Sequence, residues 1–188
     1  MSKQIILASG SPRRSALLKS LGWKFKVQPA EIKEKIKPQW SARQNARYLS
    51  RQKALAIAAG LRTGLVIAAD TLVAIDNRIL GKPRTLTEAR KMLRQLSGCE
   101  HRVMTAVTVI DIASGKMKQK TVTTKVKFKQ LDQQTINRYL AKVNPLDKAA
   151  AYAIQEHGDF LIESIRGDYH NVMGLPLKAL KELWENEF

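Results

Sequence analysis

Residues 5–18 read Ile-Ile-Leu-Ala-Ser-Gly-Ser-Pro-Arg-Arg-Ser-Ala-Leu-Leu, and this stretch predicts a strand, a tight loop and a helix in succession. Ser11 is suited to cap the helix, and Pro12 suits its first turn. The free backbone N–H groups and the positive end of the helix dipole then face the loop. Arg13 and Arg14 add two permanent charges that match phosphate oxygens. The stretch therefore predicts a phosphate-binding loop, with an ordinary capped helix carrying exposed arginines as the alternative.

Strands and helices alternate along the rest of the chain. The patterning predicts helices at 12–21, 41–59, 87–96 and 177–187, and strands at 5–8, 65–75, 103–112 and 121–128. Asp76-Asn77 predicts a hairpin turn that leads into a strand at 78–80. This order is typical of an α/β fold with a mixed sheet. No linker or internal repeat divides residues 1–188, so we expect a single domain.

Composition limits the classes of protein to consider. The chain has 188 residues, of which 44% are hydrophobic, and this is enough for a sizeable core. No run approaches the roughly 18 apolar residues of a membrane span, and the first residues are not typical of a signal peptide. We therefore expect a cytoplasmic protein with no membrane partner. The single cysteine, Cys99, excludes an intramolecular disulfide and a multi-cysteine metal site.

The formal net charge of +17 is the strongest anomaly of the composition. It suggests attraction to polyanions such as nucleic acid, or to small anionic substrates. Arg43, Arg47 and Arg51 recur every four residues and predict one solvated stripe on a helix. Lys125 and Lys127 alternate with apolar residues and predict the outward face of a half-buried strand. Because the few aromatic residues are not interleaved with these basic runs, we expect no platform for stacking bases.

Three charged residues stand in positions that favour a role in a site. On a helix over 41–57, Lys53 shares its face with small apolar residues, so it either meets an anion or snorkels to solvent. Asp70 ends the apolar strand 65–69, and ligands in α/β folds collect beyond the carboxyl ends of strands. Asp70 is therefore a candidate general base or metal ligand, with a turn aspartate as the alternative. Lys82 lies between a glycine and a proline, and this rigid turn fixes the direction of its charge.

Two later segments complete the set of candidates. Gln155 ends an apolar segment, and its amide suits the reading of a base edge, with a satisfied core glutamine as the alternative. Residues 167–176 predict a close-turning loop whose glycines let the backbone approach a ligand. The chain has no Walker loop, no dinucleotide-binding glycine motif, no His-Glu-x-x-His and no serine nucleophile elbow. These absences exclude several common nucleotide-binding and hydrolase classes.

Six short motifs then occur in a fixed order. They are Ser9-Gly10-Ser11-Pro12-Arg13-Arg14, Ala68-Ala69-Asp70-Thr71, Gly81-Lys82-Pro83, Leu96-Ser97-Gly98, Asp147-Lys148-Ala149 and Gly174-Leu175-Pro176. Together they span nearly the whole chain, which thereby resembles the Maf family of nucleoside triphosphate pyrophosphatases. The resemblance implies a two-lobed α/β fold with a mixed sheet and flanking helices, shared with inosine triphosphate pyrophosphatases. It also implies a substrate cleft between the lobes and a homodimer.

The resemblance further implies hydrolysis of a nucleoside triphosphate to the monophosphate and pyrophosphate, in a house-cleaning role. Asp70 matches the family's proton acceptor. The residues that match its polar pocket are Ser9, Arg13, Arg14, Glu34, Lys53 and Lys82, and those at its specificity positions are Arg13, Thr71 and Gln155. Arginine and threonine at the first two of these favour the branch acting on dTTP and UTP over the branch acting on 7-methyl-GTP. CTP and modified pyrimidine nucleotides are the further substrates to consider.

The family reaction uses a divalent cation, Mg²⁺ or Mn²⁺, and we expect Asp70 and Glu34 to bind it. Alignment from the arginine pair favours Glu34 for this role, with Glu31 as the alternative. Ala68 and Ala150 replace two glycines usual in the family, a change that removes no functional group. The +17 charge supports a competing function, a nucleic-acid-binding protein that has this scaffold without its hydrolase activity.

Overall fold

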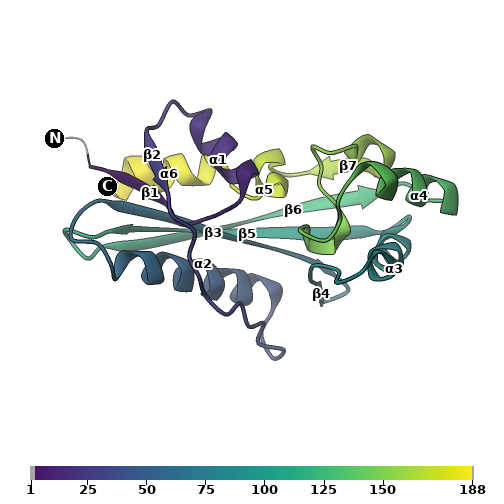
Figure 1. The fold of residues 1–188 in the computed structure, drawn as a ribbon, viewed down its shortest axis with the longest axis horizontal. Coiled ribbons are helices and arrows are strands. Elements are labelled where there is room, and N and C mark those ends of the chain that lie inside the picture. The colour runs from purple at the N-terminus through teal and green to yellow at the C-terminus, as the bar shows by residue number, and fades with distance from the viewer. Residues whose placement is uncertain (1–2, 188) are drawn as a thin grey trace.

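A seven-stranded mixed sheet forms the centre of the computed structural model, which describes residues 3–187 (Figure 1). The strands are β1 (Ile5–Leu7), β2 (Phe25–Val27), β3 (Leu65–Ile75), β4 (Arg78–Leu80), β5 (Glu100–Asp111), β6 (Met117–Phe128) and β7 (Ile162–Arg166). Their order is β2-β1-β3-β5-β6-β7, and β4 pairs with β3. β1 is parallel to β2 and β3, and the remaining pairs are antiparallel. The predicted mixed sheet is confirmed.

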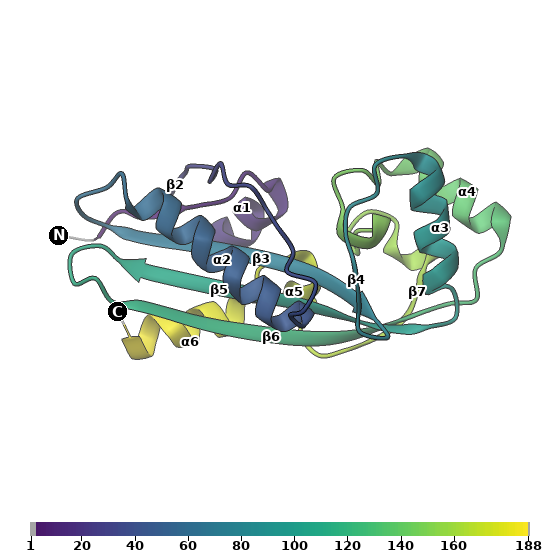
Figure 2. The ribbon, with the colours of Figure 1, turned by 90° about the horizontal axis from the view of Figure 1, so that it is seen from below.

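The helices gather at the two ends of this sheet and give the molecule two lobes (Figure 2). In the first lobe, α2 (Ala42–Ala58) covers one face of the sheet, while α1 (Pro12–Lys19) and α6 (Leu177–Glu187) cover the other. The second lobe contains α3 (Leu86–Leu96), α4 (Gln133–Lys142) and the 3₁₀ turns η1 (Ala149–Ala151) and η2 (Gly158–Phe160). The short helix α5 (Tyr169–Met173) contacts β5, β6 and α1. No helix within residues 3–187 is long and apolar enough to cross a membrane.

The apolar core follows the two lobes. In the first lobe, alternation along β1 and β3 sends Leu7 and Ile67 toward α1 and α6, and Ile6 and Val66 toward α2. This two-sided burial explains why residues 65–69 are continuously apolar. In the second lobe, α3 and α4 pack with Phe128 and other apolar side chains of the sheet.

Most of the predicted elements are confirmed, but the place of Asp70 was wrong. β3 does not end at this residue, because residues 71–75 continue the pairing with β5 and β4. Asp70 therefore lies in the middle of a strand. We expected a ligand to bind beyond the carboxyl end of a strand, and the strand that ends near Asp70 is β1. Its last residue, Leu7, pairs with Ile67, so β1 ends just before the level of Asp70.

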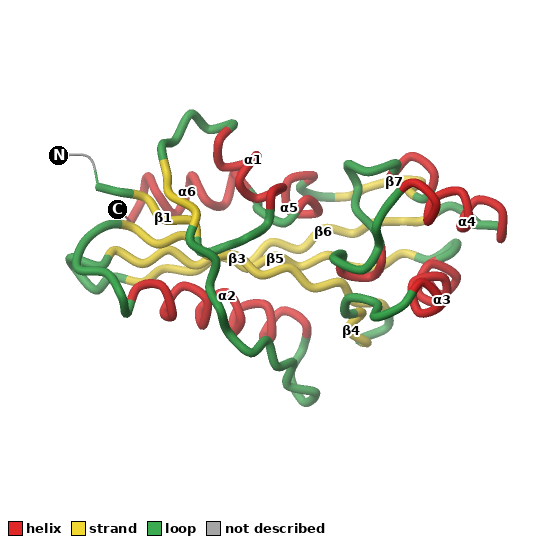
Figure 3. The backbone as a smooth tube through the Cα atoms, in the orientation of Figure 1, coloured by secondary structure: helices red, strands yellow, loops and turns green. Residues whose placement is uncertain are grey.

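Residues 167–176 form more than the close-turning loop that the glycines predicted. The side chain of Asp168 accepts a hydrogen bond from the backbone of Asn171 and so caps α5, and Gly174 ends this helix with a φ of 107°. The hairpin prediction is confirmed, since Asp76 and Asn77 both have positive φ angles, as its turn requires. Figure 3 shows the long loop between β2 and α2, which runs past the sheet toward the gap between the lobes.

Candidate active site

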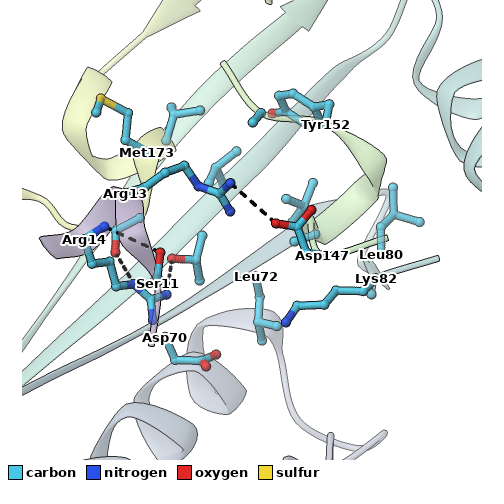
Figure 4. Close-up of a pocket in the computed structure, with 18 of the residues that line it drawn as sticks. Ser11, Arg13, Arg14, Asp70, Leu72, Leu80, Lys82, Asp147, Tyr152 and Met173 are labelled. Atoms are coloured by element: carbon cyan, nitrogen blue, oxygen red, sulfur yellow. Dashed lines mark hydrogen bonds and ion pairs between the residues drawn. The ribbon is translucent and has the colours of Figure 1, made fainter. Parts of the chain in front are cut away.

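A pocket of about 370 Å³ lies between the two lobes, lined by residues of both (Figure 4). From the first lobe come the start of α1, the loop before α2, the inner face of α2 and the middle of β3. From the second lobe come the turn after β4 and residues 147–154. The expected cleft between lobes is therefore present, and most of the predicted site residues reach it.

Arg14 is held rigidly at the start of α1. Its Nε donates to the carbonyl of Gly174 at 2.9 Å, its Nη2 to Thr71 Oγ1 at 3.1 Å and its Nη1 to Ser9 Oγ at 3.2 Å. Burial lowers the pKa of Arg14, but a guanidinium remains charged in proteins. Ser9 is buried behind the guanidinium rather than lining the pocket, so the structure gives it the position of a support for Arg14.

The start of α1 has the predicted form. The side chain of Ser11 accepts a hydrogen bond from the backbone N–H of Arg14, and Pro12 occupies the first turn. Ser11 lines the pocket together with Arg13 and Arg14. The positive end of the helix dipole and the two guanidinium groups thus belong to the same side of the cleft.

Lys53 lies between two carboxylates. Its Nζ is 2.6 Å from Asp70 Oδ1 and 2.7 Å from Glu34 Oε1, and the lysine is only 8% exposed. The interior position predicted for Lys53 is therefore confirmed, and the anions that it meets belong to the chain itself. Its role as a phosphate ligand stays a prediction.

Asp70 and Glu34 differ in how their surroundings shift their pKa values. Burial raises the pKa of Asp70 above its ordinary value, although the charges of Lys53 and Arg14 act against this. Burial also acts to raise the pKa of Glu34, but the hydrogen bond and charge of Lys53 prevail and lower it. Asp70 Oδ2 is buried with no hydrogen-bond partner within residues 3–187. One oxygen of this carboxylate is thus unengaged and able to accept a proton or bind a cation.

The acidic residues of the site suit a cation shared with a substrate. Glu34 lines the pocket and Glu31 does not, so the structure favours the first of the two alternatives. No group of three or more His, Cys, Asp or Glu in the described part of the chain is placed to hold a metal ion alone. Mg²⁺ is commonly bound by one or two carboxylates together with substrate phosphates. Asp70 and Glu34 match that donor set.

The second lobe contributes both charge and ion pairs. Lys82 points into the pocket from the side opposite Arg13 and Arg14 (Figure 4). Arg13 Nη1 reaches across to Glu156 Oε1 at 3.3 Å and to Asp147 Oδ2 at 3.9 Å. The buried Nζ of Lys148 joins these carboxylates, at 2.8 Å from Asp147 and 3.1 Å from Glu156. Arg13 therefore connects the two lobes. No local sequence pattern indicates that Glu156 is its partner.

The three predicted specificity residues do not lie together. Thr71 lines the pocket, and its hydroxyl is shared between Arg14 and Thr105 Oγ1, the latter at 3.0 Å. Gln155 is exposed and does not line the pocket, so it is neither the core glutamine of the alternative interpretation nor a residue of the site as it stands. Arg13 and Thr71 are therefore the specificity candidates that the cleft brings together.

An apolar wall completes the cleft. Its members are Leu72, Val73, Leu80, Val103, Tyr152, Ala153, Ile154, Val172 and Met173. Behind the ring of Tyr152, the hydroxyl lies 2.7 Å from Nε2 of the buried His101. The arrangement offers fixed cations for phosphates, a partly free carboxylate, and an apolar surface suited to a planar base.

The chain is similar to known proteins over nearly its whole length. A family model described as "Maf-like protein" matches residues 4–187. A "dTTP/UTP pyrophosphatase" of Pelotomaculum thermopropionicum is 44% identical over 181 residues, which cover 96% of this chain and 95% of that protein. A protein of the same name from Alkaliphilus oremlandii is 45% identical over 187 residues, covering 99% and 97%. The solved structure of the Staphylococcus aureus Ham1 protein, 15% identical, covers 99% of this chain and 100% of that one with a TM-score of 0.55, which supports the fold.

Proposed function

The chain belongs to the family of Maf-like proteins, and from this premise we propose that it hydrolyses dTTP and UTP to the monophosphate and pyrophosphate. The observation that carries the proposal is the carboxylate of Asp70, held against Lys53 in a pocket that also contains Arg14 and Lys82. Relatives named "dTTP/UTP pyrophosphatase", which are 41–45% identical over nearly the whole chain, support the enzyme class and the substrates.

The main obstacle to the reaction is the negative charge that accumulates on the triphosphate. Arg14 is fixed by three hydrogen bonds, so it needs no reorganisation when the phosphates arrive. Lys82 meets the phosphates from the opposite lobe. A substrate bound between these cations has its α-phosphorus near Asp70.

Asp70 is the general base of the proposed reaction. Its free Oδ2 accepts a proton from water as the water oxygen bonds to the α-phosphorus, and the bond from that phosphorus to the departing pyrophosphate breaks. Burial raises the pKa of Asp70, which makes the carboxylate a stronger base than an exposed aspartate. The charge of Lys53 acts in the other direction and favours the ionised form of the carboxylate.

A divalent cation, Mg²⁺ or Mn²⁺, is part of the proposal, with Asp70 and Glu34 as the residues that would hold it. Such an ion supplies charge neutralisation at the phosphate oxygens. The chain's own contribution is the position of the two carboxylates on either side of Lys53.

Further parts of the proposal concern the base and the assembly. The apolar wall around Tyr152 receives the base, with Arg13 and Thr71 beside it, and CTP or modified pyrimidine nucleotides are additional substrates. Removal of such nucleotides is a house-cleaning role. The homodimer stays a prediction. Size-exclusion chromatography with light scattering measures the mass of the assembly and tests it.

The proposal is tested by measuring pyrophosphate release with Mg²⁺ or Mn²⁺ across the common nucleoside triphosphates, 7-methyl-GTP and modified pyrimidine triphosphates. We expect dTTP and UTP to be the fastest. Asp70→Asn should lower turnover by roughly 10² or more while nucleotide binding is kept. Asp76→Asn is the matched control, because Asp76 lies in the β3–β4 turn and asparagine tolerates its positive φ.

Two results would contradict the proposal. Unchanged turnover in Asp70→Asn would remove this residue from the mechanism. No pyrophosphate release from any nucleotide would favour the competing function, nucleic-acid binding without hydrolysis.

A further inference from the structure

A second hollow lies on the face of α2 that is turned away from the active-site cleft. Its volume is about 280 Å³, and the residues that line it are Trp40, Gln44, Arg47, Tyr48, Arg51 and Gln119. None of these is acidic. Leu49 and Lys53, the residues of α2 that line the cleft, do not line this hollow, which is therefore separate from the active site.

Two aromatic rings form one edge of this hollow, and a lysine packs against both of them. Trp40 and Tyr48 pack edge to face, with ring centroids 5.5 Å apart. Lys37 Nζ lies 3.9 Å from the centroid of the Trp40 ring and 4.4 Å from that of Tyr48. Both rings stay partly exposed. The protein thus presents a pair of π-systems beside positive charge at its surface, whereas the sequence predicted no platform for stacking bases.

This edge is held in place from within. The fully buried side chain of Asn45 accepts a hydrogen bond from the backbone N–H of Lys37 at 2.8 Å, and its amide donates to the carbonyls of Lys37, Trp40 and Ser41. Ser41 and Gln44 form a capping box at the start of α2. The loop carrying Lys37 and Trp40 is therefore fixed to the helix before any ligand arrives, which reduces the entropy cost of binding.

The other edge is the arginine stripe predicted from the sequence. Arg43, Arg47 and Arg51 are all exposed, and they have no carboxylate at ion-pair distance in the part of the chain that the structure describes. Four residues of helix advance about 6 Å, so the charges form an evenly spaced row. Such a row beside aromatic faces matches the two needs of a single-stranded nucleic acid, a positive track for its phosphates and a surface for its bases.

We propose that this face of α2 binds single-stranded nucleic acid. A base stacks against Trp40, whose ring Tyr48 supports edge to face, and neighbouring phosphates contact Arg47 and Arg51. The interaction is tolerant of sequence, since stacking and charge rather than base edges provide the contacts. It is a property additional to nucleotide hydrolysis and does not depend on the chemistry of Asp70.

The first test measures the binding of a fluorescently labelled oligothymidylate by anisotropy over a range of salt concentrations. We expect binding by the intact protein, and a much weaker interaction in the double variant Arg47→Gln/Arg51→Gln. The negative slope of log affinity against log salt should shrink by about 0.7 for each phosphate that the variant no longer neutralises. Lys24→Gln/Lys26→Gln is the matched control, because it removes two exposed charges at β2 that have no ion pair among the described residues.

The comparison of the two double variants distinguishes a binding site on α2 from a general effect of net charge. An equal loss of oligothymidylate affinity in the two double variants would overturn the proposal. An intact protein that does not bind the oligonucleotide would overturn it as well. Pyrophosphate release from dTTP should be unchanged in both variants, which shows that they are folded. A preference for duplex over single strand would also contradict a stacking platform.

The second test concerns the aromatic edge. Trp40→Ala should weaken oligothymidylate binding roughly tenfold or more, and Trp40→Phe should restore most of the affinity because a stacking face returns. Equal affinity of the alanine and phenylalanine variants would show that Trp40 contributes no stacking. Asp70→Asn should bind the oligonucleotide as the intact protein does, so this test can fail or succeed whatever the outcome for hydrolysis.

Discussion

At the residue scale, His101 shows how a group outside the chemistry can limit the conditions in which the protein is stable. It is buried, its Nε2 pairs with the hydroxyl of Tyr152, and its Nδ1 has no partner within residues 3–187. Burial lowers the pKa of His101 from 6.5 to about 4. The imidazole is therefore neutral in the folded protein at pH 5, where the unfolded chain would protonate it.

This difference predicts a loss of stability on mild acidification. The contribution of His101 is fully present above pH 6.5 and is lost as the pH falls toward 4, because the unfolded state then binds a proton that the folded state excludes. Between pH 7 and pH 5 the free energy of unfolding should fall by about 2 kcal/mol through this group. Urea denaturation at the two pH values measures it.

His101→Gln is the control for that prediction, since glutamine keeps a hydrogen-bonding group for Tyr152 and does not titrate. Its free energy of unfolding should depend less on pH by the same amount, even if the variant is less stable at both pH values. An equal pH dependence in the two proteins would show that His101 is not the cause.

Site residues could be predicted from the sequence where a charged side chain stands at a position that the surrounding pattern makes apolar. Lys53 and Asp70 are of this kind, and both lie in the cleft. Glu156 and His101 were missed because their partners, Arg13 and Tyr152, are 143 and 51 residues away along the chain. Only the folded chain brings such pairs together, and no local spacing records them.

At the element scale, the end of α5 supports the phosphate-binding arginine. Gly174 adopts a φ of 107° and offers its carbonyl to Arg14 Nε. A Cβ added at this glycine would lie 3.3 Å from Thr71 Oγ1 and 3.5 Å from Arg14 Nε. The short helix thus favours glycine at its end both for its backbone conformation and for the space beside Thr71.

Gly174→Ala should therefore affect stability and substrate binding together. Positive φ alone costs about 1 kcal/mol for alanine. The added methyl group should also crowd Thr71 Oγ1, which accepts a hydrogen bond from Arg14. Arg14 then loses part of its support, and KM for dTTP should rise severalfold. Denaturant unfolding and steady-state kinetics measure the two effects.

Gly115→Ala separates these causes. Gly115 has a φ of 68°, and a Cβ there would meet nothing within 4 Å. It should show the loss of stability without the change in KM. If both variants had the same KM as the intact protein, the end of α5 would have no part in seating Arg14.

Length alone did not decide which elements were predicted from the sequence. The three-residue strands β1 and β4 were predicted, whereas the ten-residue helix α4 was missed. The eleven residues of β3 and the hairpin that follows are confirmed because their apolar run and turn residues are unambiguous. β2 has three residues and no buried side chain, so nothing in its pattern indicates a strand. The 3₁₀ turn η1 holds Ala150 at a φ of 55°, a conformation that alanine rarely adopts and that its sequence does not indicate.

At the scale of the whole molecule, the net charge of +17 should speed the capture of an anionic substrate. We expect kcat/KM for dTTP to fall as salt rises, because ions screen the attraction over distances beyond about 10 Å at 0.1 M. The turnover number should change little, since the interactions of Arg14 and Lys53 inside the cleft are short. Kinetics at constant pH and cation concentration over a salt series measure this.

The opposite pattern would contradict a role for long-range charge. If kcat/KM did not depend on salt while kcat fell, salt would be acting on interactions inside the cleft rather than on substrate capture. An uncharged solute such as sucrose serves as the control for viscosity and excluded volume.

Three long strands, β3, β5 and β6, run through both lobes and leave no break in the sheet beneath the cleft. Neither lobe can lose its structure without exposing the hydrogen bonds of strands that the other lobe shares. The backbone amides of β3 and β5 should therefore exchange with deuterium only when the whole protein opens, at equal rates on either side of Asp70. A protease that cuts an exposed turn should leave the two fragments bound to each other rather than release an independently folded half.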